Sequence, residues 1–279
     1  MNQNLLQEKK REFALDLLRV LACFLVIWQH VAEVYYIGPD FTVPTHDEMP
    51  LIGWMNSMTP IEVPLFVMIS GYFLLPLKMD ITAFFKRRFT RILIPFVVWC
   101  VAYSAYFMLY RGDTLVQFLR NVAHIPVNLG VEIGHMWFIY MLLGLYMLVP
   151  IISPWLEQCS KRQLQGYLGV WAFTTLLPYI HLCFWNPTPM LHYFTGFAGY
   201  FVLGYYIKRY GALSVRNALL LLVGGYLFTV AVYQYRLERV TSISDLEICW
   251  RFCSANMMLM TYAMFSLVSR IKWQGNNAF

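Results

Sequence analysis

The sequence has few charged side chains: Asp, Glu, Lys and Arg make up 13% of its 279 residues, compared with about 25% in soluble domains. Hydrophobic residues account for 59%, and the mean hydropathy is +0.53. The deficit of charge extends along the whole chain, so no stretch resembles a separate soluble domain. The composition therefore excludes an ordinary soluble enzyme and favours an integral membrane protein.

The chain also lacks the residue spacings that hold metals or disulfide frameworks. Its six cysteines lie mostly inside apolar stretches, and no HxxxH or HExxH pattern occurs. We therefore expect structural thiols and no metal site. No small-residue cleavage site follows the first apolar stretch, so we expect an uncleaved first span rather than a signal peptide.

What the sequence does contain is eight hydrophobic stretches of about the length that a ~30 Å hydrocarbon core requires. They lie at residues 13–34, 56–77, 92–110, 135–152, 164–181, 190–207, 217–235 and 249–269. No internal repeat, low-complexity tract or linker interrupts them. We predict an all-α polytopic transmembrane helical bundle of about eight spans, forming a single domain over residues 1–279.

The basic residues predict the topology of this bundle. Most of the 21 Lys and Arg residues fall on one side of the membrane if the N-terminus is inside, which predicts that both termini are cytoplasmic. This bias also explains the net charge of +6, so we infer no nucleic-acid partner. Four prolines in or beside the spans are expected to kink or end helices: Pro60, Pro64, Pro95 and Pro126.

The first hydrophobic stretch carries ionisable residues on one face. Arg19 and His30 lie eleven residues apart, and Asp16 lies one turn before Arg19. Eleven residues make about three helical turns, so Arg19 and His30 lie roughly 16 Å apart along the axis on nearly the same side. Ionisable groups inside a span are costly and usually face a bundle interior or a wet cavity. We predict a polar path that runs from one side of the bilayer toward the other.

A basic cluster at residues 86–91 precedes the third predicted span. Within it, Arg88 and Arg91 are three residues apart, so on a helix they point the same way. Guanidinium groups bind phosphates through paired hydrogen bonds, and this pair suits a phosphorylated donor at the inner mouth. The positive-inside rule explains the same cluster without any ligand, and both interpretations stay open.

Three further segments have both a structural and a functional interpretation. For Ser70 and Gly71, inside the second span, close helix packing is favoured over a nucleophilic serine, because no base is adjacent in the sequence. Glu62 is expected at the membrane edge, where it pairs with an arginine or reaches water. His135 and Trp137 open the fourth span, where they either belong to an aromatic belt or line a sugar-binding mouth.

Four of these segments, in this order, resemble the membrane acyltransferase-3 family. The segments are Leu15–Arg19 with His30, Met68–Tyr72, Arg88–Pro95 and His135–Phe138. Their order and spacing match the Arg-x10-His and Arg-x-x-Arg motifs of that family. Within the family, the chain most resembles the shorter O-acetyltransferases of the enterobacterial-common-antigen type, which have no appended soluble domain.

The resemblance implies a multi-spanning enzyme of the bacterial cytoplasmic (inner) membrane. Such an enzyme moves an acetyl group from cytoplasmic acetyl-CoA to a hydroxyl of a cell-surface glycan or glycolipid, without a metal. By the same resemblance, Arg88 and Arg91 hold the CoA donor, Arg19 lines its entry, and His30 is the catalytic base, with Asp16 in the same catalytic stripe. The remaining candidates for contact with the substrate are His135, Trp137 and Glu62.

Members of this family usually have further C-terminal helices, whereas this chain ends soon after the eighth predicted span. We therefore expect those helices to be missing, and a short variant, a truncated gene product and a chain completed by a partner all stay open as explanations. A transporter or flippase of a polar or glycolipid substrate is the second hypothesis, because intramembrane charges also mark transport paths. No inverted repeat of the kind that many transporters show is visible. An inactive remnant or interaction protein is the third hypothesis.

Overall fold

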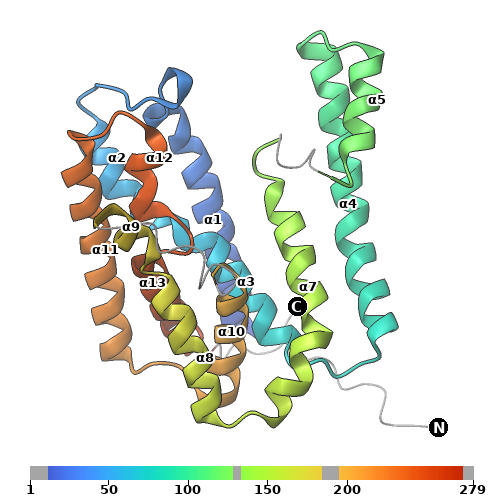
Figure 1. Cartoon of the computed structure of the whole chain (residues 1–279), viewed down its shortest axis with the longest axis vertical. Helices are drawn as coiled ribbons and strands as arrows, with labels where there is room; N and C mark the ends of the chain where they lie inside the picture. The colour runs from blue at the N-terminus through green and yellow to red at the C-terminus, as the bar shows by residue number, and fades with distance from the viewer. Residues whose placement is uncertain (1–11, 128–132, 184–194, 273–279) are drawn as a thin grey trace. The chain divides into compact units, whose positions relative to one another are not determined.

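The computed structural model describes residues 12–127, 133–183 and 195–272, and over these residues every regular element is a helix (Figure 1). Within the same residues, β pairing is limited to one isolated bridge between Thr42 and Ser242. The all-α class is therefore confirmed. The chain forms two compact units, residues 1–73 with 160–279 and residues 74–159, and each is described by itself.

The first unit contains most of the helices. Its α-helices are α1 (Phe13–Tyr36), α2 (Met49–Asn56), α3 (Glu62–Leu74), α8 (Lys161–Thr174), α9 (Leu177–Cys183), α10 (Ala198–Tyr210), α11 (Val215–Leu237), α12 (Ile243–Leu246) and α13 (Ala255–Val268). Its short 3-10 helices are η1 (Pro39–Phe41), η2 (Thr59–Ile61) and η4 (Glu247–Trp250). α11 packs along α13, as Figure 1 shows, and α1 packs on α2 and η2.

The second unit is built from three helices, α4 (Ile81–Tyr110), α5 (Leu115–His124) and α7 (Trp137–Gln158). α4 packs against both α5 and α7. Phe96, Cys100 and Ile125 form the buried centre of this packing. The Tyr140 hydroxyl of α7 adds a 2.5 Å hydrogen bond to the Ile125 carbonyl, which fixes α7 to the end of α5.

Five helical stretches are long and apolar enough to cross a membrane, at residues 13–36, 49–74, 81–110, 137–158 and 215–237. Each of the five overlaps a span expected from hydropathy. The other three predicted spans coincide with the shorter helices α8 and α9, α10, and α13, although residues 190–194 lie outside the described residues. The count of eight spans and the cytoplasmic position of both termini stay predictions.

α4 begins earlier than hydropathy predicted. Its N-cap is Asp80, whose carboxylate accepts a 2.9 Å hydrogen bond from the Ala83 amide, so the basic cluster at residues 86–91 is helical. Of the two effects expected of Pro95, a kink or a helix end, the structure excludes the second, because α4 continues through it. A helical proline removes one hydrogen bond, here the bond to the Arg91 carbonyl, and membrane helices tolerate such losses.

Two glycines let α3 and α10 approach until their backbones touch. A Cβ atom on Gly71 would lie 1.8 Å from the Phe201 carbonyl oxygen, and a Cβ atom on Gly204 would lie 2.0 Å from the Met68 carbonyl oxygen. Small residues permit this closeness between helices in a membrane, where dispersion contacts drive association. The packing interpretation of the Ser70 and Gly71 segment is therefore confirmed.

This crossing gives a direct test. Gly71→Ala should lower the free energy of unfolding by about 1–3 kcal/mol, because α3 and α10 must separate to admit the methyl group. Gly224→Ala on α11 is the matched control, since a Cβ there meets nothing within 4 Å. The control should be neutral or stabilising by roughly 0.5–1 kcal/mol, the usual gain of alanine over glycine in a helix. Thermal unfolding in detergent measures both, and equal midpoints would contradict the described crossing.

Candidate active site

α1 presents a buried face and a polar stripe side by side. Leu15, Leu18, Ala22 and Leu25 recur at helical spacing, and all four are buried inside the first unit. The ionisable residues lie on the neighbouring face, where they are only partly buried. The predicted stripe is therefore present on one continuous helix, Phe13–Tyr36, and it consists of two local pairs.

The first pair lies near the start of α1, where the Arg19 guanidinium forms an ion pair with the Asp16 carboxylate. The same guanidinium lies over the Phe73 ring, 5.0 Å from its centroid. Next to Phe73, the Tyr72 ring has the Lys208 ammonium 5.5 Å from its centroid. Two cations and two aromatic rings thus surround this end of the stripe. Phe73 and Lys208 were not foreseen, because they come from α3 and α10.

The second pair lies about three turns further along α1. His30 Nδ1 lies 3.0 Å from Glu33 Oε1, and the side chains are 47% and 35% exposed. The imidazole is thus held by Glu33 through Nδ1, and about half of the side chain is exposed. Glu33 was not among the predicted site residues, although its spacing of three from His30 is the ordinary spacing of helical side-chain pairs.

Glu62 does not lie where the sequence suggested. It is 3% exposed, and its Oε2 has no hydrogen-bond partner among the described residues. The expectation of a membrane-edge carboxylate that reaches water is wrong. The reason is that α3 starts inside the unit, since the flanking Ile61 and Val63 are buried as well. The structure thus buries the Glu62 carboxyl inside the first unit.

Glu247, in η4, belongs to the same region of the first unit. Burial raises the pKa of the Glu247 carboxyl above its ordinary value, and the hydrogen bond from the Tyr36 hydroxyl opposes part of that shift. Glu33 is near enough to raise the pKa of Glu247 further, while Arg251 lowers it. Glu33 therefore contacts its histidine partner on α1 and lies near the Glu62 and Glu247 carboxyl groups of other elements.

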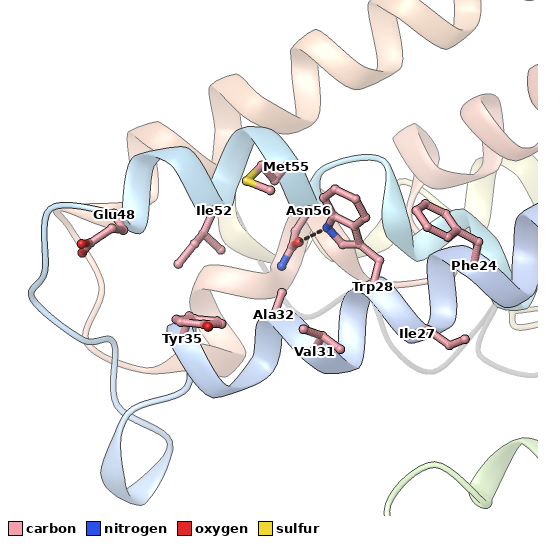
Figure 2. A pocket seen from close by; sticks show the side chains of 10 residues that line it. All are labelled: Phe24, Ile27, Trp28, Val31, Ala32, Tyr35, Glu48, Ile52, Met55 and Asn56. Atoms are coloured by element: carbon pink, nitrogen blue, oxygen red, sulfur yellow. Dashed lines mark hydrogen bonds between the residues drawn. The ribbon is translucent and has the colours of Figure 1, made fainter.

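An apolar groove of about 460 Å³ runs along another face of α1. Figure 2 shows side chains of α1 on one side and the α2 segment on the other, with the Trp28 indole donating a 3.2 Å hydrogen bond to the Asn56 side-chain oxygen. The lining residues are Phe24, Ile27, Trp28, Val31, Ala32, Tyr35, Glu48, Ile52, Met55 and Asn56. This set contains no Lys or Arg and no member of the polar stripe, so the groove suits hydrocarbon and not the phosphates of a CoA donor.

The second unit carries the predicted donor-binding arginines on α4. Arg88 is half-buried near Tyr146 of α7, and its Nε has no hydrogen-bond partner among the described residues. Arg91, one turn later, is exposed. Arg88 thus has a donor without a partner among the described residues, and the Arg91 side chain is exposed to solvent. Both features suit a pair of arginines that binds an anion.

The other predicted substrate residues also lie in the second unit. His135 is exposed, and its Nε2 lies 3.2 Å from the Tyr103 hydroxyl, with the two rings 5.5 Å apart edge to face. Trp137 begins α7 two residues later. The structure thus brings His135 into contact with Tyr103 of α4. The two residues are far apart in the sequence, so no local spacing indicated this contact.

The chain is thus an all-α membrane protein with ionisable residues along α1 and a pair of arginines on α4. A family model for an acyltransferase domain, that of the acyltransferase-3 family, matches residues 12–274. The chain therefore belongs to the acyltransferase-3 family and is a membrane acyltransferase. No curated protein and no solved structure was found to match it significantly. The closer resemblance to the enterobacterial-common-antigen type stays a prediction.

The pKa of Glu247 predicts a pH-dependent stability. A carboxyl whose pKa is raised by folding costs stability as the pH rises above its unfolded value, because the folded state holds the proton more tightly. Glu247→Gln cannot ionise, so the variant should unfold at a higher temperature than wild type at pH 8, with a smaller difference at pH 5. Glu48→Gln, at a carboxylate that is 70% exposed, controls for the loss of one negative charge. A pH-independent difference would contradict the assignment.

Proposed function

We propose that this membrane acyltransferase is an O-acetyltransferase of the bacterial cytoplasmic membrane. It moves an acetyl group from cytoplasmic acetyl-CoA to a hydroxyl of a cell-surface glycan or glycolipid. The observation that carries this proposal is the stripe on α1, where the Asp16–Arg19 and His30–Glu33 pairs lie on one membrane-spanning helix. A basic group for an anionic donor and a proton acceptor for a hydroxyl are thus supplied by one continuous element.

His30 is proposed as the catalytic base. Its imidazole takes the proton of the acceptor hydroxyl while the hydroxyl oxygen attacks the thioester carbonyl carbon of the donor. A carbon–oxygen bond forms, the carbon–sulfur bond breaks, and the proton passes on to the departing CoA thiolate. Histidine suits this task because its ordinary pKa lets it accept and release a proton near neutral pH.

The donor is proposed to be held by arginines. CoA carries several phosphates, and guanidinium groups pair with phosphate oxygens in a planar, two-bond geometry. Arg88 offers a buried Nε without a partner among the described residues, and Arg91 is exposed. Arg19 is proposed to line the entry, where its charge is already balanced by Asp16.

The acceptor is proposed to contact His135 and Trp137. Sugar rings bind aromatic faces through their apolar C–H surfaces, and the His135–Tyr103 contact adds polar groups next to such a face. Glu62 is not assigned to the acceptor, because its carboxyl is buried.

The role of His30 predicts a specific loss. His30→Ala should abolish the transfer of [14C]acetyl from acetyl-CoA to lipid and glycan fractions in inverted membrane vesicles, because general-base catalysis supplies roughly 10²–10⁴-fold of rate. His46→Ala is the matched control, since His46 also pairs with a glutamate, at 2.9 Å, but lies outside the candidate spans. Full transfer by the His30 variant, at equal amounts in the membrane, would refute this role.

The donor site predicts a second loss. Arg88→Ala with Arg91→Ala should weaken acetyl-CoA binding to the purified protein by roughly 10–100-fold, since charge-assisted hydrogen bonds contribute about 1.5–3 kcal/mol each. Lys86→Ala with Arg87→Ala removes the same charge from the same turn of α4, at two exposed positions, and should change binding little. Equal weakening by both double variants would show a general charge effect rather than a donor site.

A further inference from the structure

Glu33 lies on the same helix as His30 but was not part of the motif that singled out the histidine. The two residues are on consecutive turns of α1, and His30 Nδ1 lies 3.0 Å from Glu33 Oε1. A carboxylate only accepts hydrogen bonds, so the proton of this contact sits on Nδ1. In the neutral imidazole Nε2 is then the unprotonated, basic nitrogen, because only one ring nitrogen bears hydrogen in that form.

The carboxylate also balances the charge that proton transfer creates. When the imidazole takes a proton from a hydroxyl it becomes a cation, within a segment that is long and apolar enough to span a membrane. A cation there is costly unless an opposite charge lies next to it. Glu33 supplies that charge in hydrogen-bonding contact, as the acidic member of a Ser-His-Asp triad does for its histidine.

Glu33 also lies near acidic groups from other elements. Glu62 at the start of α3 and Glu247 in η4 are both close enough to interact with it electrostatically. Glu247 is hydrogen-bonded to Tyr36, one turn beyond Glu33 on α1. Acidic groups of α3 and η4 thus lie near Glu33, while its own ion pair is with His30 on α1.

We propose that Glu33 is a positioning residue of acyl transfer: it holds the His30 imidazole through Nδ1, keeps Nε2 as the unprotonated, basic nitrogen, and stabilises the imidazolium that forms. This inference rests on the proposed function. It adds to the site a residue that acts through the base and touches neither donor nor acceptor. The competing explanation is an ordinary helix pair, which stabilises α1 slightly and has no part in the reaction.

The two explanations differ in what Glu33→Gln changes. The amide keeps the size of the side chain but loses its charge. Its NH2 group can also donate a hydrogen bond, so it no longer has to accept one from Nδ1. The positioning role predicts a kcat lower by roughly 10–100-fold, part of the 10²–10⁴-fold that a general base supplies, with KM for acetyl-CoA within about twofold of wild type. Glu33→Asp keeps the charge and should recover part of kcat. A helix pair predicts unchanged kcat in both variants.

The measurement is initial-rate transfer of [14C]acetyl from acetyl-CoA in inverted vesicles, with wild type, Glu33→Gln, Glu33→Asp and His30→Ala side by side. Glu48→Gln is the matched control, since it breaks the other His–Glu pair, His46–Glu48 at 2.9 Å, and should keep wild-type kcat. Acetyl-CoA binding by each purified variant shows that it is folded, because a positioning residue leaves donor binding intact.

The outcomes separate this inference from the proposed function. A low kcat with normal donor binding in Glu33→Gln, partly restored in Glu33→Asp, supports positioning. Wild-type kcat in Glu33→Gln, beside an inactive His30→Ala, overturns the role of Glu33 and leaves the proposed function standing. Loss of donor binding in Glu33→Gln and Glu33→Asp alike would make the residue structural and overturn its positioning role. Absence of transfer by wild type would overturn the proposed function, and this inference with it.

Discussion

The rest of the structure depends on how one apolar helix carries ionisable side chains. Charged groups inside a membrane segment need partners, and α1 supplies them from its own sequence at a spacing of three. Asp16 pairs with Arg19, and Glu33 pairs with His30. Because both pairs are local, the stripe does not need to be buried to be stable. The adjacent face of α1 is left free to pack into the first unit with leucine and alanine.

Close helix packing then decides what surrounds the stripe. Gly71 and Gly204 bring the backbones of α3 and α10 into contact. This crossing lies beside Tyr72 and Phe73, whose rings receive the Lys208 and Arg19 cations. The glycine contact between α3 and α10 and the Asp16–Arg19 pair look independent in the sequence. In the structure they are neighbours, because Tyr72 and Phe73 follow Gly71 directly. The family motif around Gly71 has a physical reason, since any side chain there would push the two helices apart.

The chemistry proposed for the site follows from which side chains are exposed and which are buried. His30 is partly exposed and held on one nitrogen, which suits a base. Glu62, which the sequence made a candidate for contact with the substrate, is buried, and for that reason it is not assigned to the acceptor. The apolar groove on α1 has no basic residue among its described lining, whereas the proposed donor-binding arginines lie on α4.

The sequence by itself determined the all-α class, the family and the shared face of Asp16 and Arg19, because helix geometry places residues three apart together wherever the helix lies. By the same rule Glu33 lies next to His30, but only the structure showed that these neighbours form ion pairs. Only the tertiary structure decided that Glu62 is buried and that Phe73 covers Arg19. Such contacts depend on which helices pack against each other and how closely. Helix periodicity in the sequence does not specify which distant segments become neighbours.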